Sequence, residues 1–189
     1  MRKTIVSEMM TLDGFFAGPD REIDWHNADG EFNEYAAAML DSADTLVFGR
    51  VTYELMAGYW PARGAAEDDP LVAAKMNALE KVVFSRTLEK TGWNNARLAM
   101  AGVGEEIGEI KKRPGKDILV LGSGSIVSEC ARLGLVDEYR IMVNPVILGR
   151  GLTLFKDMPG RLKLKLVKTR TFRSGNVLLC YEPADKGKR

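Results

Sequence analysis

The chain has 189 residues, of which 46% are hydrophobic, and its 27 basic and 26 acidic residues leave a net charge of +1. This composition is typical of one soluble domain that buries a core, and it excludes the strongly basic surface that nucleic-acid binding requires. Because no apolar run approaches the roughly 20 residues of a membrane span and Met1 leads directly into an expected strand, we expect a cytoplasmic protein without membrane or nucleic-acid partners.

The cysteine and histidine content argues against a zinc site. Cys130 and Cys180 fall in an expected helix and an expected strand, without the paired spacing of metal ligands. We interpret both as reduced core residues. His26 is the single histidine and makes no plausible zinc site with them, so we expect no metal ligands, while a magnesium site built from carboxylates alone stays open.

Strand and helix patterns alternate from the start of the chain. The expected elements are a strand over 5–10, a helix over 31–40, a buried strand over 45–48 and a helix over 52–57 that ends at Gly58. The segment 59–70, rich in charged residues, alanine and glycine, is expected to be an irregular loop.

The alternation continues through the middle of the chain. We expect a helix over 71–79, strands over 81–84 and 97–101, a helix over 103–112 and a strand over 117–121. An apolar stripe formed by Ile126, Val127, Cys130 and Leu133 predicts one more helix, which Gly134 closes.

From Asp137 onward the pattern is β-rich without helices. Strands are expected over 138–143, 162–172 and 176–181, with a hairpin turn over 173–176. An α/β body that ends in an antiparallel hairpin implies a mixed sheet. We expect residues 1–184 to form one domain and residues 185–189 to form a disordered tail.

Two strand-to-helix turns carry most of the functional signal. Each of two apolar runs stops at a glycine, Gly49 or Gly122, and a helix-like pattern follows. A helix that begins there points unpaired N–H groups and a partial positive charge beyond the strand end, which favours phosphate. Either turn alone fits an ordinary α/β connection, whereas the pair indicates a cofactor that carries a diphosphate.

Six short motifs occur along the chain: MTLDGFFA (10–17), ADTLVFGRVTYE (43–54), VVFSRTL (82–88), VLGSGS (120–125), LVDE (135–138) and NPVILGRG (144–151). In this order they resemble the dihydrofolate reductase-like superfamily, and more closely the stand-alone relatives of the reductase half of the riboflavin-pathway deaminase-reductase. The resemblance spans nearly the whole chain. It implies a three-layer α/β/α fold around a mixed, mostly parallel sheet with a C-terminal antiparallel hairpin, and it favours a homodimer.

The resemblance implies NADPH as the cofactor. The residues that match the family's cofactor-binding segments are Ala17, Gly49, Arg50, Thr52, Ser85, Arg86, Thr87, Leu121, Gly122, Ser123, Gly124, Ser125 and Ile126. In the second glycine turn, residues without bulky side chains let the backbone approach the diphosphate. Arg50 and Arg86 supply the cationic donors that a 2′-phosphate needs, which favours NADPH over NADH, although Arg86 alone fits a solvated arginine equally well.

The same resemblance implies hydride transfer to a C=N or C=O carbon. Asp13 would lie near the nicotinamide, and it is equally a good turn residue. The buried acid of dihydrofolate reductases falls here on Asn33, which argues against dihydrofolate as substrate. The flanking Glu31 and Glu34 are therefore the candidate proton donors, with solvated helix positions as the alternative.

The expected substrate is small or apolar. The chain has no Lys or Arg from Glu22 through Phe48, so a ribose phosphate would lack its anchors, and the deaminase zinc motif is absent. The candidate substrate residues are Trp25, Phe16, Met56 and Trp60. Two alternatives stay open: an NADPH-binding protein without efficient catalysis, and a true riboflavin-pathway 5-amino-6-(5-phosphoribosylamino)uracil reductase.

Overall fold

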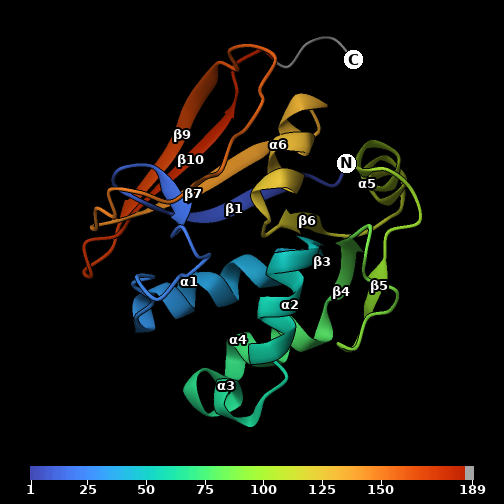
Figure 1. Cartoon of the computed structure of the whole chain (residues 1–189), viewed down its shortest axis with the longest axis horizontal. Helices are drawn as coiled ribbons and strands as arrows, with labels where there is room; N and C mark the ends of the chain where they lie inside the picture. Colours follow the sequence, from blue (N-terminus) through green and yellow to red (C-terminus); the bar gives the residue numbers. More distant parts are fainter. Residues whose placement is uncertain (186–189) are drawn as a thin grey trace.

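An eight-stranded sheet forms the centre of the computed structural model, which describes residues 1–185, and its strand order is β5-β4-β3-β6-β1-β7-β10-β9. The strands are β1 (Thr4–Thr11), β3 (Ala43–Gly49), β4 (Glu80–Phe84), β5 (Ala96–Leu98), β6 (Asp117–Val120), β7 (Glu138–Asn144), β9 (Leu164–Thr171) and β10 (Val177–Pro183). The strands from β5 to β7 pair in parallel, while β10 and β9 are added as an antiparallel hairpin (Figure 1).

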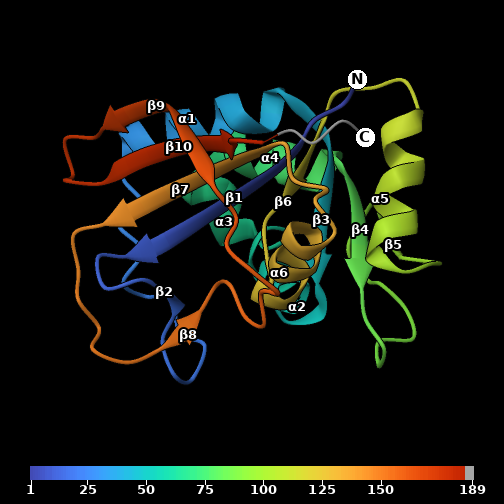
Figure 2. The same cartoon turned by 90° about the horizontal axis from the view of Figure 1, so that it is seen from above.

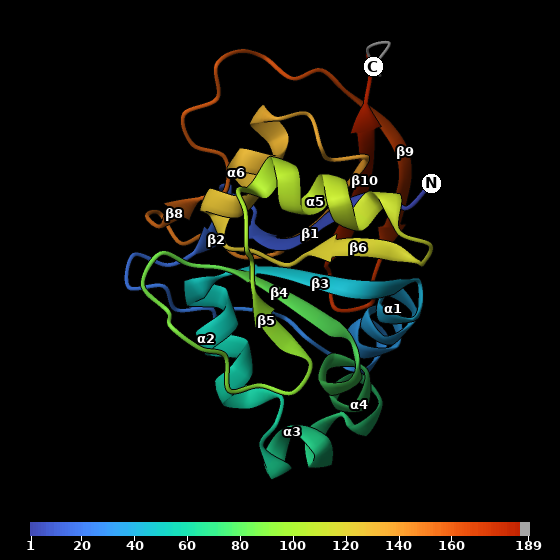
Figure 3. The ribbon, with the colours of Figure 1, turned by 90° about the vertical axis from the view of Figure 1, so that its right-hand side faces the viewer.

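Helices cover both faces of this sheet. One face carries α1 (Gly30–Asp41), α2 (Arg50–Tyr59), α3 (Arg63–Asp68) and α4 (Pro70–Ala78), and the other carries α5 (Val103–Lys112) and α6 (Gly124–Arg132) (Figure 3). A small antiparallel sheet of β2 (Phe15–Ala17) and β8 (Leu152–Thr153) lies beside the ends of β1 and β7 (Figure 2). The expected three-layer fold with a mixed sheet is therefore confirmed, and all of the expected tail except Asp185 lies outside the described residues.

Two expectations about the segment after β3 were wrong. Helix α2 does not end at Gly58 but continues to Tyr59, because the exposed Gly58 costs an α-helix only about 1 kcal/mol. The expected loop over 59–70 contains α3, a short helix of alanine and charged residues. Ala65 of α3 is 1% exposed, so the packing of this residue in the core stabilises the helix. The β2–β8 sheet was not expected either, because each strand is too short to show a period.

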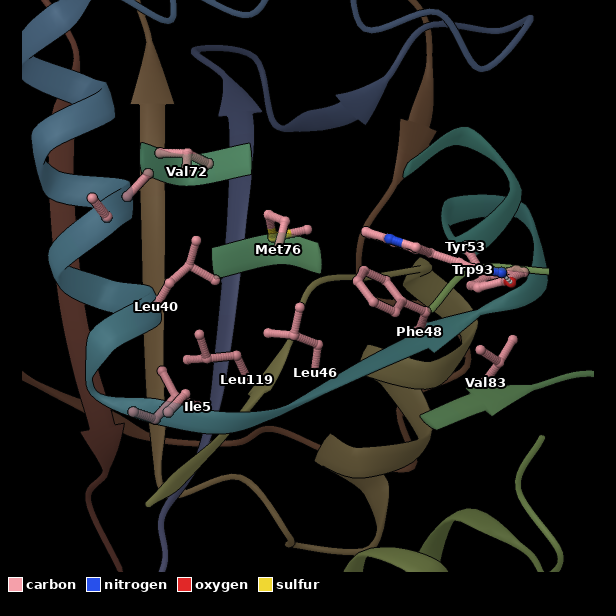
Figure 4. Close-up of a cluster of buried hydrophobic side chains, with 13 residues drawn as sticks. Ile5, Leu40, Leu46, Phe48, Tyr53, Val72, Met76, Val83, Trp93 and Leu119 are labelled. Atoms are coloured by element: carbon pink, nitrogen blue, oxygen red, sulfur yellow. Dashed lines mark hydrogen bonds between the residues drawn. The ribbon is translucent and has the colours of Figure 1, made fainter. Parts of the chain in front are cut away.

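Strand β3 supplies the core on both faces of the sheet. Leu46 and Phe48 pack with Leu40, Val72 and Met76 under α1 and α4 (Figure 4). The intervening Val47 points to the opposite face, where the apolar residues of α5 and α6 pack. Because both faces of β3 are buried, its sequence is a nearly continuous apolar run.

A buried tyrosine ties α2 to the loop that precedes β5. The Tyr53 hydroxyl accepts hydrogen bonds from the backbone N–H groups of Gly92 and Trp93, each at 3.1 Å. The side chain is 4% exposed, so it belongs to the core and not to a substrate pocket.

We predict that Tyr53→Phe lowers the free energy of unfolding by about 1–3 kcal/mol, because it leaves two N–H groups without their acceptor. Tyr59→Phe is the matched control, since the Tyr59 hydroxyl meets Asp68 at 3.2 Å on the surface and should change stability by less than about 0.5 kcal/mol. Urea denaturation measures both variants, and equal losses would contradict the structural role of Tyr53.

Candidate functional site

The parallel register brings the ends of β3 and β6 together at one edge of the sheet, beside β1. Val120 of β6 pairs with Val47 of β3 on one side and with Val6 of β1 on the other. The turns that follow β3 and β6 therefore meet, and the N–H of Gly49 donates to the carbonyl of Gly122 at 2.9 Å. The two motifs that the sequence singled out lie side by side.

Both glycines are required by this contact itself. A Cβ on Gly49 would collide with the Ser123 hydroxyl, and one on Gly122, whose φ is +103°, would lie 2.8 Å from Thr52 Oγ1. A Cβ on Gly124 would lie 3.1 Å from the Phe16 ring. The glycines thus let the two turns pack, in addition to any approach of a diphosphate.

The helices that leave these turns have no side-chain caps. The N-cap residues of α2 and α6, Gly49 and Ser123, make no side-chain hydrogen bond to their helix, whereas Asp29 and Asp69 cap α1 and α4. N–H groups in the first turns of α2 and α6 therefore remain available to an anionic acceptor, apart from that of Ile126, which donates to the Ser123 carbonyl at 2.9 Å.

A first cavity of about 350 Å³ opens above these two helix starts. Six of the residues expected to bind the cofactor line it: Ala17, Thr52, Leu121, Ser123, Gly124 and Ser125. Sequence reasoning missed its three cations, Arg21, Arg132 and Lys156, because they come from segments outside the motifs. This cavity combines backbone donors, hydroxyls and positive charge, which suits phosphate groups.

The other expected cofactor residues do not line this cavity. Gly49, Gly122 and Ile126 belong to the packed turns beneath it. The guanidinium of Arg50 donates to Glu54 at 2.8 Å on the surface. These residues are placed beside the cavity without reaching into it.

The segment Ser85-Arg86-Thr87 lies at the same edge. Gly49 is level with Phe84 in the β3–β4 register, so the turn after β4 is next to the start of α2. The Ser85 hydroxyl accepts from the N–H groups of Thr87 and Leu88, and Arg86 is exposed. The position is compatible with the expected 2′-phosphate role.

A second cavity of about 800 Å³ adjoins the first. Its wall is mainly apolar and includes Phe32, Met39, Met56, Trp60, Met76 and Met142. Its carboxyl-bearing residues are Glu8, Asp68 and Asp69, and none of the residues that line it in the described part of the chain is Lys or Arg. The two cavities share Glu8, Ile23, His26, Leu55, Met56 and Leu121.

The four expected substrate residues divide between these spaces. Met56 lines both cavities and Trp60 lines the second, whereas Phe16 lines the first. Trp25 lines neither cavity and packs edge-on against His26, with ring centroids 4.5 Å apart. Trp25 therefore supports the wall from behind.

Glu8 is the residue at the junction that sequence reasoning missed. Its Oε1 is buried and has no hydrogen-bond partner among the described residues. Burial raises the pKa of Glu8 to about 8, so the carboxyl is largely protonated at neutral pH. On the sequence it is one polar residue within a strand, and nothing distinguishes it there.

The acids expected from the sequence lie elsewhere, and none of them lines either cavity. Glu31 accepts from the backbone N–H of Arg173 and from the Arg170 guanidinium, both at 2.9 Å, and these bonds lower its pKa. Glu34 is exposed. Their positions give no support to a proton-donor role.

Asp13 has a structural role as well. Its carboxylate accepts from the Thr11 hydroxyl at 2.6 Å and from the N–H of Gly149 at 2.7 Å, and the Thr11 bond is the main cause of its lowered pKa. Leu12 adds a backbone bond to Val146 at 2.8 Å. The segment after β1 is thereby fastened to the loop after β7, as the turn alternative for Asp13 implies.

His26 completes the wall at the junction. Burial lowers its pKa to about 4, so the ring is neutral at pH 7, and its Nε2 has no partner among the described residues. Cys130 and Cys180 are buried and unpaired, as expected of core cysteines. Within residues 1–185, no three metal-ligating side chains gather in one place, and no helix has the length and apolar character to cross a membrane.

The comparisons with known proteins identify the family and agree with the fold. The sequence matches the RibD C-terminal domain family over residues 2–178. It is 37% identical over 182 residues to the uncharacterized protein YyaP of Bacillus subtilis strain 168, covering 95% of this chain and 94% of that protein. The chain therefore belongs to the RibD C-terminal domain family.

Two solved structures show the same fold. A putative riboflavin biosynthesis protein from Shewanella sp. PV-4 superposes with a TM-score of 0.76 at 20% identity, over 97% of this chain and 99% of that one. Dihydrofolate reductase from Enterococcus faecalis, in a complex with NADP(H) and RAB-propyl, gives a TM-score of 0.66 at 14% identity over 97% of each chain. The fold is that of dihydrofolate reductase.

We predict that the protonated Glu8 makes stability depend on pH. The folded protein keeps a proton that the unfolded chain releases between its ordinary pKa of 4.5 and the folded value of about 8. This contribution is therefore fully present below pH 4.5 and is lost as the pH rises to about 8. Each pKa unit corresponds to about 1.4 kcal/mol.

Glu8→Gln removes this dependence, so the variant should gain stability relative to the unsubstituted protein between pH 5 and pH 8.5. Urea unfolding at the two pH values measures the difference in the free energy of unfolding between the variant and the unsubstituted protein. The other titrating groups are common to both proteins, so their contributions cancel in this difference. The control is Glu109→Gln on the surface of α5, whose difference should stay constant. A constant difference for Glu8→Gln would mean that Glu8 is ionised in the folded protein.

Proposed function

We propose that this protein is an NADPH-dependent reductase that acts on a small heterocyclic or carbonyl substrate. The observation that carries the proposal is the pair of uncapped helix starts, α2 and α6, which open into a cationic cavity that adjoins an apolar one. The dihydrofolate reductase fold and the reductase family support this arrangement. A cofactor and a reducible compound could thus be held next to each other.

The residues of the first cavity fit NADPH by their chemistry. The backbone N–H groups at the start of α2 and α6, with the hydroxyls of Thr52 and Ser125, would hold the diphosphate. Arg50 and Arg86 remain the proposed partners of the 2′-phosphate, with Arg21, Arg132 and Lys156 as further cations. When bound, NADPH supplies the hydride for the reduction.

The second cavity favours an uncharged or cationic substrate with an apolar ring. Its wall holds carboxyl groups and no Lys or Arg among the lining residues described, so a phosphate would be repelled there and left without donors. This argues against the phosphoribosyl substrate of the riboflavin pathway. It leaves pterin-like, pyrimidine-like and simple carbonyl compounds.

The protein is proposed to act as a homodimer in the cytoplasm. Edge strand β9 supports self-association, because Leu164, Leu166 and Val167 are 39%, 48% and 46% exposed beside its unpaired backbone edge. Sedimentation equilibrium measures the assembly directly, and a monomer at micromolar concentration would contradict it.

We predict that the double variant Arg50→Ala with Arg86→Ala weakens NADPH much more than NADH. Each charge-assisted pair to the 2′-phosphate contributes roughly 1.5–3 kcal/mol, and NADH lacks this group. Titration calorimetry with both cofactors measures the effect, with Arg113→Ala at the end of α5 as the control arginine. Equal weakening of both cofactors would refute the assignment of the two arginines.

The proposed reaction is tested by NADPH oxidation with a panel of pterins, pyrimidines, quinones and aldehydes. We expect turnover with at least one uncharged member and none with the phosphoribosylated uracil. Tight NADPH binding without turnover on the whole panel would instead favour the cofactor-binding alternative. Turnover of the phosphoribosylated uracil alone would establish the riboflavin-pathway reaction.

A further inference from the structure

The position of Glu8 in β1 sets its side chain at the junction of the two cavities. Val6 pairs with Val120, the last residue of β6, so Glu8, two residues further on, has no strand partner on that side. The turn of Gly122 occupies this place, and Glu8 Oε1 lies 3.3 Å from the point where a Cβ on Gly122 would be. The carboxyl therefore borders the cofactor cavity and the substrate cavity together.

Among the side chains around the junction of the two cavities, Glu8 is the one suited to donate a proton. Its neighbour across the sheet is Ile141 of β7, and Arg140 beside that residue is engaged with Glu138 at 2.7 Å. From α1, Tyr35 borders the second cavity, and burial raises its pKa to about 12.

The other facing groups do not compete for this role. His26, from the loop before α1, is neutral at pH 7. Helix α2 presents Thr52, Leu55 and Met56, of which the hydroxyl is a far weaker acid than a carboxyl. The charged side chains of the first cavity that come from the remaining elements, Arg21, Arg132, Lys156 and Asp157, are exposed.

We propose that Glu8 is the catalytic acid of the reduction. Bound NADPH would supply the hydride that forms the new C–H bond at the substrate carbon, and the π bond of the C=O or C=N group would break. The electron pair goes to the oxygen or nitrogen, which takes the proton from the Glu8 carboxyl. The oxidised cofactor, the alcohol or amine product and a Glu8 carboxylate remain, and solvent reprotonates the carboxylate. This inference rests on the proposed function.

The closing experiment compares Glu8→Gln with Glu31→Gln and with the surface control Glu109→Gln, using the panel member that the unsubstituted protein turns over. Glu8→Gln should lower kcat about 100-fold or more, because general acids contribute typically 10²–10⁴-fold, while the Kd of NADPH stays within about twofold. The kcat of the unsubstituted protein should fall above pH 8, and this fall should be absent in Glu8→Gln.

Infrared difference spectra give a readout that is independent of turnover. A protonated carboxyl band that titrates near pH 8 and is missing in Glu8→Gln supports the proposal, and titration of Glu8 near pH 4.5 overturns it. If the unsubstituted protein is active and Glu8→Gln keeps its turnover and pH profile, or if Glu31→Gln shows the loss instead, Glu8 is not the acid. If the unsubstituted protein oxidises NADPH with no panel member, the proposed function itself fails, and the role of Glu8 fails with it.

Discussion

The parallel register of β3, β6 and β1 is the constraint on which the rest of the site depends. Because Val47, Val120 and Val6 are level, the ends of β3 and β6 and the starts of α2 and α6 converge beside the middle of β1. The short β6 ends first, and its glycine turn fills the space beside Glu8. The helix starts proposed to bind phosphate and the position of the Glu8 carboxyl are therefore two consequences of the same alignment.

The fold was predictable because the elements that form it carry strong local signals. The apolar run of β3, the apolar stripe of α6 and the turn before β10 can each be recognised from a few neighbouring residues. The two glycine turns were found for the same reason. Failures occurred where local signals are weak or absent: α3 is held by the buried Ala65, and β2 pairs with a strand more than 130 residues away in the chain.

The site was only partly predictable, because burial and pairing depend on segments far apart in the sequence. Glu31 and Glu8 are both glutamates that precede an apolar residue, and the helix pattern drew attention to Glu31. The hairpin of β9 and β10 brings Arg170 and Arg173 to Glu31, while no Lys or Arg among residues 1–185 forms an ion pair with Glu8. The Arg170–Glu31 pair, whose members are 139 residues apart in the chain, thus keeps Glu31 ionised. Glu8 has no such partner among the described residues, and its burial favours the neutral carboxyl.

A neutral carboxyl at this junction is also compatible with the ligands proposed for both cavities. An ionised Glu8 would face an anionic cofactor on one side and an apolar wall with further carboxyl groups on the other, and both would disfavour its charge. A negatively charged ligand in the first cavity, such as the proposed cofactor, would add a repulsion that favours the protonated carboxyl. Binding of that cofactor and protonation of Glu8 would therefore favour each other by linkage.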